Sequence, residues 1–190
     1  MKLLNYVVLI LGVFCIHGVS AEKNIQYNYG EFRFVVDSDL DDTSLDGDGF
    51  AFSGSLRLDE LFYAIVDYEA IEYDRNAEIT DLQVGAGLIA PVRNVDGIAE
   101  LAIIHRDVDH LPIGDSDTGF RFSGGLRGYL TPQFELRGTV NLIEVDDFDD
   151  TFITIAGDYF LNDSVSINIA KDLSADIERF SIGVRLYLGE

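Results

Sequence analysis

The stretch FRFSGGLRGYL, residues 120–130, alternates apolar and polar side chains from end to end. Its even-numbered positions hold only Phe, Gly or Leu, and its odd-numbered positions hold Arg, Ser, Gly or Tyr. A period of two is typical of a β-strand, because successive side chains of a strand point to opposite faces. The stretch therefore predicts a strand with one apolar face and one polar face that carries arginines.

The same pattern recurs along the chain, in segments of about ten residues separated by short polar breaks. No helical periodicity interrupts it, so the sequence predicts an all-β protein. The ninth segment is the shortest, and eight strands is the alternative to ten. The ten expected strands are residues 26–36, 50–58, 62–73, 80–90, 98–107, 119–130, 134–145, 151–161, 165–171 and 179–188.

Alternation alone does not separate a soluble sheet from a membrane sheet, but the length of the apolar faces and the placement of the arginines do. The apolar faces are nine to eleven residues long, which is what a tilted strand needs to cross a bilayer. An arginine facing lipid near the midplane costs about 2–4 kcal/mol, so three would cost about 6–12 kcal/mol. That is comparable with the whole stability of a domain, about 5–15 kcal/mol. The arginines must therefore point inward, which predicts a closed, antiparallel, up-and-down transmembrane β-barrel.

The inward faces are expected to carry a network of ion pairs. Carboxylates on the same faces can neutralise the guanidinium groups, and a barrel of eight to ten strands is just about filled by its own side chains. We therefore favour a structural network that plugs the lumen over a charge-lined channel. The expected members are Arg33, Arg57, Asp67, Glu69, Glu100, Arg121, Arg127, Glu135, Arg137, Asp158 and Arg185, with Glu31 on the same faces.

Aromatic residues gather near the strand ends, as in the interfacial girdles of membrane barrels. One expected rim consists of Phe62, Tyr63, Tyr129, Phe134, Tyr159, Phe160 and Tyr187. The other consists of Phe34, Phe50, Phe120, Phe122, Phe152 and Phe180.

The composition excludes several classes of protein. The 190 residues carry 13 Lys and Arg against 34 Asp and Glu, a net charge of −21, so the chain would repel nucleic acid. Hydrophobic residues make up 47% of the chain, which is too much for a disordered protein. Past residue 21, no apolar run approaches the roughly 20 residues of a membrane-spanning helix.

Residues 1–21 are predicted to be a secretory signal peptide. Lys2 precedes an apolar stretch, and Val19-Ser20-Ala21 has the small-x-small pattern of a cleavage site. The mature domain would then be residues 22–190. The only cysteine, Cys15, lies in the signal peptide, so no disulfide is expected.

Most aspartates fall in the breaks that are expected to form the outer loops, residues 37–49, 74–79, 108–118, 146–150 and 172–178. A run of charge is usually a solvated surface, but clustered carboxylates also suit divalent cations such as Ca²⁺. An EF-hand is rejected, because Asp42 stands at the glycine position and no helices flank the loop. The possible cation-binding loop contains Asp37, Asp39, Asp41, Asp46 and Asp48.

We do not expect an enzyme. No glycine-rich phosphate loop, zinc-ligand spacing or nucleophile elbow appears, and no cofactor is expected. The alternative is a rim hydrolase in which His105 or His110, paired with an aspartate, activates a water molecule.

Five short motifs together resemble the small outer-membrane β-barrel proteins of diderm bacteria (porin-like, OmpA/OmpX-like). They are Tyr27-Asn28-Tyr29, Asp46-Gly47-Asp48-Gly49-Phe50, Gly85-Ala86-Gly87, Gly124-Gly125-Leu126-Arg127 and Gly183-Val184-Arg185-Leu186. The resemblance implies an outer-membrane location after cleavage near Ala21, with insertion by the barrel-assembly machinery. It also implies outer-membrane lipid and lipopolysaccharide as partners, and a structural or surface-interaction role. A narrow porin-like channel for small solutes or cations is the alternative.

Overall fold

A computed structural model describes residues 24–40, 45–74, 77–92, 94–110, 113–145, 148–174 and 177–189, and these form ten strands. In this part of the chain, no helix is long and apolar enough to cross a membrane. The strands are β1 (Tyr29–Leu40), β2 (Leu45–Arg57), β3 (Phe62–Tyr73), β4 (Ala77–Val92), β5 (Val95–His110), β6 (Ile113–Thr131), β7 (Phe134–Val145), β8 (Phe148–Asn162), β9 (Val165–Leu173) and β10 (Ile177–Tyr187).

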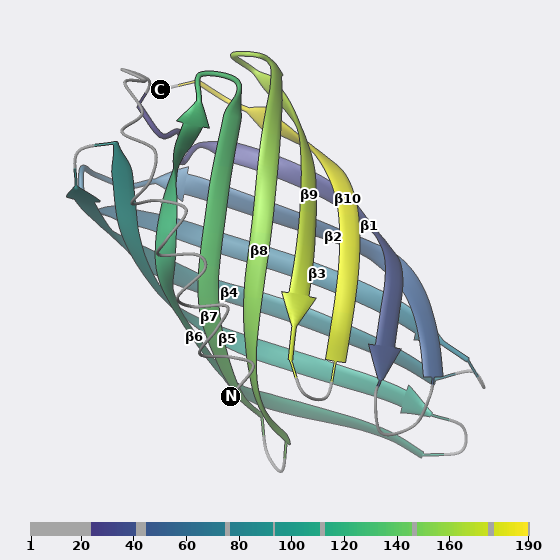
Figure 1. The fold of residues 1–190 in the computed structure, drawn as a ribbon. Coiled ribbons are helices and arrows are strands. Elements are labelled where there is room, and N and C mark those ends of the chain that lie inside the picture. Colours follow the sequence, from purple (N-terminus) through teal and green to yellow (C-terminus); the bar gives the residue numbers. More distant parts are fainter. Residues whose placement is uncertain are drawn as a thin grey trace.

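The ten strands close into one barrel, in which each strand pairs antiparallel with its neighbours in sequence (Figure 1). The ring closes where β1 pairs with β10, from Tyr29 opposite Tyr187 to Leu40 opposite Ile177. The predicted up-and-down barrel of ten strands is therefore confirmed, and the alternative of eight strands is wrong. The short ninth segment is a full member of the ring, paired with β8 and β10.

The exterior of the barrel is apolar. Its exposed side chains include Phe34, Val84, Leu101, Phe120 and Phe122, each more than half exposed. Between the two ends of the barrel, charged side chains lie on the inward faces, where Glu135, Asp158 and Arg185 are buried. This is the reverse of a water-soluble protein, and a closed barrel with an apolar outside leaves no unpaired backbone group facing hydrocarbon. The surface therefore fits a lipid solvent.

Both termini of the described chain lie at one end of the barrel, which we call the terminal end (Figure 1). There the Asn28 side chain donates a hydrogen bond to the carbonyl of Gly189, and the Leu188 amide donates to the carbonyl of Asn28. The connections β2–β3, β4–β5, β6–β7 and β8–β9 also lie at this end. The other ends of the strands lie at the opposite end of the barrel.

The ranges expected for the outer loops are too wide, because the strands at the opposite end run further than the alternation of apolar residues indicates. Asp37 and Asp39 lie in β1, and Asp46 and Asp48 lie in β2. β5 and β6 pair up to His110 opposite Ile113. Beyond the hydrocarbon both faces of a strand meet water, so the backbone ladder continues after the apolar face has ended.

The break predicted at residues 91–97 is also mostly strand. Pro91 pairs with Asp96 and Val92 pairs with Val95, which leaves two residues for the turn. The structure therefore has short turns at the terminal end.

Candidate functional site: the barrel lumen

A cluster of buried hydrophobic side chains lies in the lumen at the terminal end. Its members come from seven of the ten strands and from the segment before β1, and each is at most 9% exposed. Their aromatic rings pack against one another across the lumen, as Tyr129 and Tyr187 do on the two sides of Phe160. The members of this terminal cluster are Ile25, Tyr27, Tyr29, Tyr63, Ile89, Ile98, Tyr129, Phe160 and Tyr187.

The segment of residues 24–28, which we call the mouth segment, crosses the terminal opening before β1 begins. Tyr27 donates a hydrogen bond from its hydroxyl to Asp96 Oδ2 at 2.9 Å, and Arg127 donates from NH2 to the carbonyl of Gln26 at 3.0 Å. The Arg127 guanidinium also lies over the Tyr27 ring, 4.8 Å from its centroid, which is a favourable cation–π position. Burial raises the pKa of the Tyr27 phenol above its usual range, so Tyr27 remains a donor.

A layer of buried ion pairs lies next to the terminal cluster. Arg127 Nε is 2.6 Å from Glu135 Oε1, and Arg185 bridges Glu31 at 2.6 Å and Asp158 at 3.0 Å. The side chains of all five residues are at most 3% exposed. Buried charges are tolerated only when they are paired and hydrogen-bonded, and these are. The layer is therefore a second set of buried side chains in the lumen, next to the cluster.

Gly87 makes room for one ring of the cluster. It stands opposite Tyr63 in the β3–β4 register, and a Cβ at position 87 would overlap the Tyr63 phenol ring. The ring covers the gap left by the missing side chain, and the Tyr63 hydroxyl donates to Glu100 Oε1 at 2.8 Å. A glycine in a strand often marks such a close approach.

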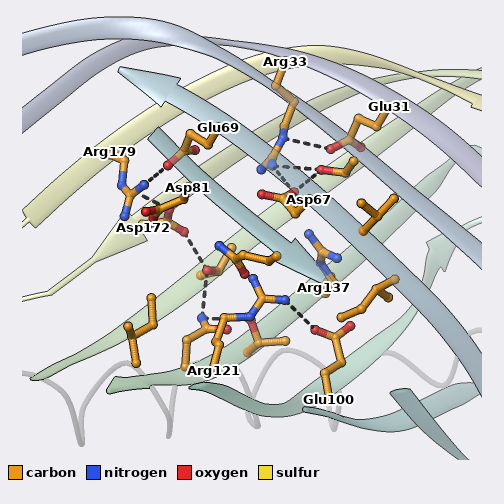
Figure 2. A pocket seen from close by; sticks show the side chains of 18 of the residues that line it. Glu31, Arg33, Asp67, Glu69, Asp81, Glu100, Arg121, Arg137, Asp172 and Arg179 are labelled. Atoms are coloured by element: carbon orange, nitrogen blue, oxygen red, sulfur yellow. Dashed lines mark hydrogen bonds and ion pairs between the residues drawn. The ribbon is translucent and has the colours of Figure 1, made fainter. Parts of the chain in front are cut away.

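A polar cavity of about 100 Å³ lies in the lumen beyond the ion-pair layer (Figure 2). Four arginines line it, and three of them are paired. Arg33 NH2 lies 3.1 Å from Asp67 Oδ2, Arg121 NH2 lies 3.3 Å from Glu100 Oε2, and Arg179 pairs with Glu69 and Asp172. The fourth, Arg137, points into the cavity between these pairs.

The members of the predicted network fall into three groups. Arg127, Glu135, Asp158 and Arg185 form the buried layer, and Arg33, Asp67, Glu69, Glu100, Arg121 and Arg137 line the cavity. Arg57 lies at the terminal opening, where it donates hydrogen bonds to the carbonyls of Asp59 and Glu60.

Arg106 and Arg179 also lie in the lumen, although the predicted network does not include them. Arg106 makes a two-pronged pair with Asp81, at 2.8 and 2.6 Å, and Arg179 pairs with Glu69. The signal was present in the sequence, because Arg106 shares the face of Glu100 on β5 and Arg179 shares the face of Arg185 on β10. Both stand near strand ends, where the alternation fades.

The assignment of aromatic residues to two lipid-facing rims is partly wrong. Phe62 and Tyr159 face outward at one end, and Phe34, Phe50, Phe120, Phe122 and Phe180 face outward toward the other. However, Tyr63, Tyr129, Phe160 and Tyr187 are buried in the terminal cluster, and Phe152 is buried in a second cluster with Ile104, Ile143 and Val145. Each shares a strand face with an inward charge, so strand parity predicts the inward position.

The candidate cation and hydrolase residues lie toward the opposite end. Asp41 and the residues around it lie outside the described chain, and Asp39 pairs with Asp46 across β1 and β2. Within the described ranges, no group of three or more His, Cys, Asp or Glu residues could hold a metal ion. His105 faces outward, with Nδ1 3.0 Å from Thr118 Oγ1. The side chain of His110 lies outside the described part, and both hypotheses stay predictions.

No protein-family model matches the chain, and no curated protein matches its sequence. Solved structures do match its fold. The β-domain of the Bordetella autotransporter BrkA matches with a TM-score of 0.51 and 9% identity, over 85% of this chain and 99% of that domain. This chain has the outer-membrane β-barrel fold.

Other structures with the outer-membrane β-barrel fold match at similar coverage. Neisserial surface protein A gives a TM-score of 0.48 and 11% identity, over 85% of this chain and 97% of that one. The KdgM porin gives 0.47 and 8%, over 85% and 99% of the two chains. At these identities the likeness is one of fold.

Proposed function

We propose that this chain is an outer-membrane barrel of a diderm bacterium with a closed lumen and a structural or surface-interaction role. In this proposal, the terminal end faces the periplasm and the opposite end faces the outside. The signal-like residues 1–21 support export, although they lie outside the described chain. The apolar exterior and the outer-membrane β-barrel fold support the membrane location.

The single observation that carries the closed lumen is the pair of barriers at the terminal end. A solute that entered the cavity from the opposite end would meet the Arg127–Glu135 and Arg185–Asp158 pairs, and then the terminal cluster. Passage would require ion pairs with side chains at most 3% exposed to separate inside the protein, which is strongly unfavourable.

The acidic opposite end supports a surface role. Twelve of the carboxylates whose side chains the structure describes are exposed there, on strand ends and turns. They would repel the phosphates of lipopolysaccharide unless divalent cations bridge the two. We therefore propose that this end contacts outer-membrane lipid, lipopolysaccharide and divalent cations. We also propose that the barrel-assembly machinery inserts the chain into the membrane. The twelve are Asp37, Asp46, Asp48, Glu72, Asp74, Glu78, Asp107, Asp109, Asp115, Glu144, Asp149 and Glu178.

Recording from planar lipid bilayers tests the closed lumen. The refolded chain should give no stable conductance steps, while unboiled gels of the same vesicles show a compact, folded band that shifts on boiling. The gel is needed because a chain that fails to insert is also silent. Stable steps from folded chain would overturn the closed lumen and favour the narrow channel, and the current reversal potential in a salt gradient would then give its ion preference.

A further inference from the structure

Arg137 differs from the other arginines of the lumen. Within the described residues, and apart from Arg57 at the terminal opening, every other inward arginine forms an ion pair with at least one carboxylate, and Arg137 forms none. The paired ones are Arg33, Arg106, Arg121, Arg127, Arg179 and Arg185.

The guanidinium of Arg137 is partly desolvated. Its Nε is buried and has no hydrogen-bond partner, and the side chain projects into the cavity (Figure 2). A guanidinium has five N–H donors and is always charged. Leaving such a group without an acceptor inside a protein costs free energy. A solute that accepts hydrogen bonds from the guanidinium would recover this free energy on binding.

The surroundings of Arg137 offer room and further donors. The cavity of about 100 Å³ exceeds the roughly 10–15 Å³ that one water molecule needs on the same scale, so a group of several heavy atoms fits. Arg121 lines the same cavity and also has a buried Nε without a partner. All six carboxylates that line the cavity are already paired with an arginine. The pairs are Glu31 with Arg185, Asp67 with Arg33, Asp81 with Arg106, Glu100 with Arg121, and Glu69 and Asp172 with Arg179.

We propose that the lumen cavity binds a small oxyanion on the guanidinium of Arg137. The chemical class is a carboxylate or a phosphate, because the planar fork of a guanidinium matches two oxygens of either group. Entry is from the opposite end, because the terminal cluster and the ion-pair layer block the other route. This site goes beyond the proposed function, since a closed barrel can hold a ligand without conducting it.

A structural role for Arg137 is the rival explanation that the test must separate. Glu31 lies within electrostatic reach of Arg137, so the guanidinium could serve only as an unbonded counter-charge for its neighbours. The two roles predict different effects of anion concentration on the stability difference between wild type and Arg137→Met. If Arg137 binds an anion, the wild-type advantage over the variant grows with anion concentration, because ligand binding stabilises the folded state by mass action. If Arg137 is only a counter-charge, the wild-type advantage stays constant or falls as the added salt screens the charges, and either result counts against an anion site.

The experiment follows the melting temperature of the detergent-folded barrel in separate titrations with sodium phosphate and sodium acetate. General salt effects act on both proteins and cancel in the difference between wild type and Arg137→Met. The control is Lys171→Met, which removes an exposed cation on the outer face whose partner is Glu178, 3.0 Å away. The control should respond to both anions as wild type does.

The expected result is a wild-type melting temperature that climbs with the logarithm of anion concentration relative to Arg137→Met. A response to acetate alone identifies a carboxylate ligand, a response to phosphate alone identifies a phosphate ligand, and a response to both identifies the shared oxyanion chemistry. Parallel curves in both titrations overturn the proposal. If Arg137→Met does not fold, the phosphorus NMR linewidth of phosphate is compared between wild type and Arg137→Lys. Equal broadening by the two proteins then overturns the proposal.

Discussion

Arg185 Nε, on the last strand of the barrel, lies 2.6 Å from Glu31 Oε2 on the first strand. The two residues are direct partners in the β1–β10 register, so an ion pair reinforces the backbone bonds that close the ring. Both side chains are at most 2% exposed. The β1–β10 seam, where the barrel closes, is therefore stabilised on its inner side by an ion pair between residues 154 positions apart in the sequence.

Replacing Arg185 with methionine should destabilise the barrel strongly. The change leaves Asp158 and Glu31 buried with a lost partner, and breaking a buried ion pair typically costs about 3–5 kcal/mol. Urea unfolding in lipid vesicles measures the free energy of unfolding. Arg57→Met is the matched control. Arg57 donates to two carbonyls at the terminal opening and lies 5.9 Å from the centroid of the Tyr27 ring, so its removal leaves no described carboxylate without an ion-pair partner and should cost about 1 kcal/mol or less. Equal effects of the two variants would contradict a structural role for the seam.

Removing the Tyr27 ring should weaken the closure of the terminal end. Tyr27→Ala deletes the hydrogen bond to Asp96 and the contact with Arg127, and it leaves a hole beside Tyr63, whose ring centroid is 4.8 Å away. We expect brief conductance events in planar bilayers that wild type does not give, and a stability loss of about 3–5 kcal/mol, as for other large core deletions.

Tyr159→Ala is the control for this experiment, because Tyr159 faces outward and is 53% exposed. It should remain silent in the bilayer. If Tyr27→Ala is as silent as Tyr159→Ala, the Tyr27 ring is not needed to seal the opening, and the rest of the terminal cluster and the ion-pair layer are sufficient.

A side chain at position 87 should displace Tyr63. Gly87→Ala places a methyl group where the Tyr63 ring lies, and overpacking of this kind costs about 1–3 kcal/mol. Gly124→Ala is the control, because a Cβ there meets no atom within 4 Å, so its cost should stay below about 0.5 kcal/mol. Urea midpoints that fall equally for both variants would show that close packing of Tyr63 on Gly87 does not contribute to the stability of the barrel.

The boundary of the lipid-facing surface can be mapped with single arginines. Leu101→Arg places a charge at an outward position of β5 that is 58% exposed, and should cost about 2–4 kcal/mol if it lies in hydrocarbon. Ser116→Arg, an exposed position on the extension of β6, should cost about 0–1 kcal/mol. Both are measured by folding into vesicles. Equal costs would mean that the apolar band does not contact lipid as described.

Much of the fold can be predicted from the sequence, because a period of two survives wherever one face meets lipid and the other meets the lumen. In β10, for example, Phe180, Ile182 and Val184 alternate with Ser181 and Arg185, and the structure has them outside and inside respectively. The placement of a strand end is harder to predict. Asp46 and Asp48 extend β2 into water, where neither face needs apolar residues, and the pattern that indicates a strand is lost.

The terminal cluster could be predicted only in part. Strand parity assigns Tyr129 to the same face as Arg127, and Tyr187 to the same face as Arg185, but large rings near strand ends are also typical of interfacial girdles. The mouth segment could not be predicted, since the contact of Gln26 with Arg127 joins residues 101 positions apart. Likewise, nothing in the sequence separates Arg137 from the paired arginines, because pairing depends on where neighbouring strands place their carboxylates.

The pairing of the first strand with the last has a consequence for biogenesis. Until β10 is in place, β1 and β9 each present a row of unsatisfied backbone donors and acceptors, which is a template for aggregation. A chain truncated after β9 would keep both of these open edges permanently. Nascent chains therefore need protection until synthesis of the final strand, and premature termination should yield a product that is degraded and does not accumulate in the membrane.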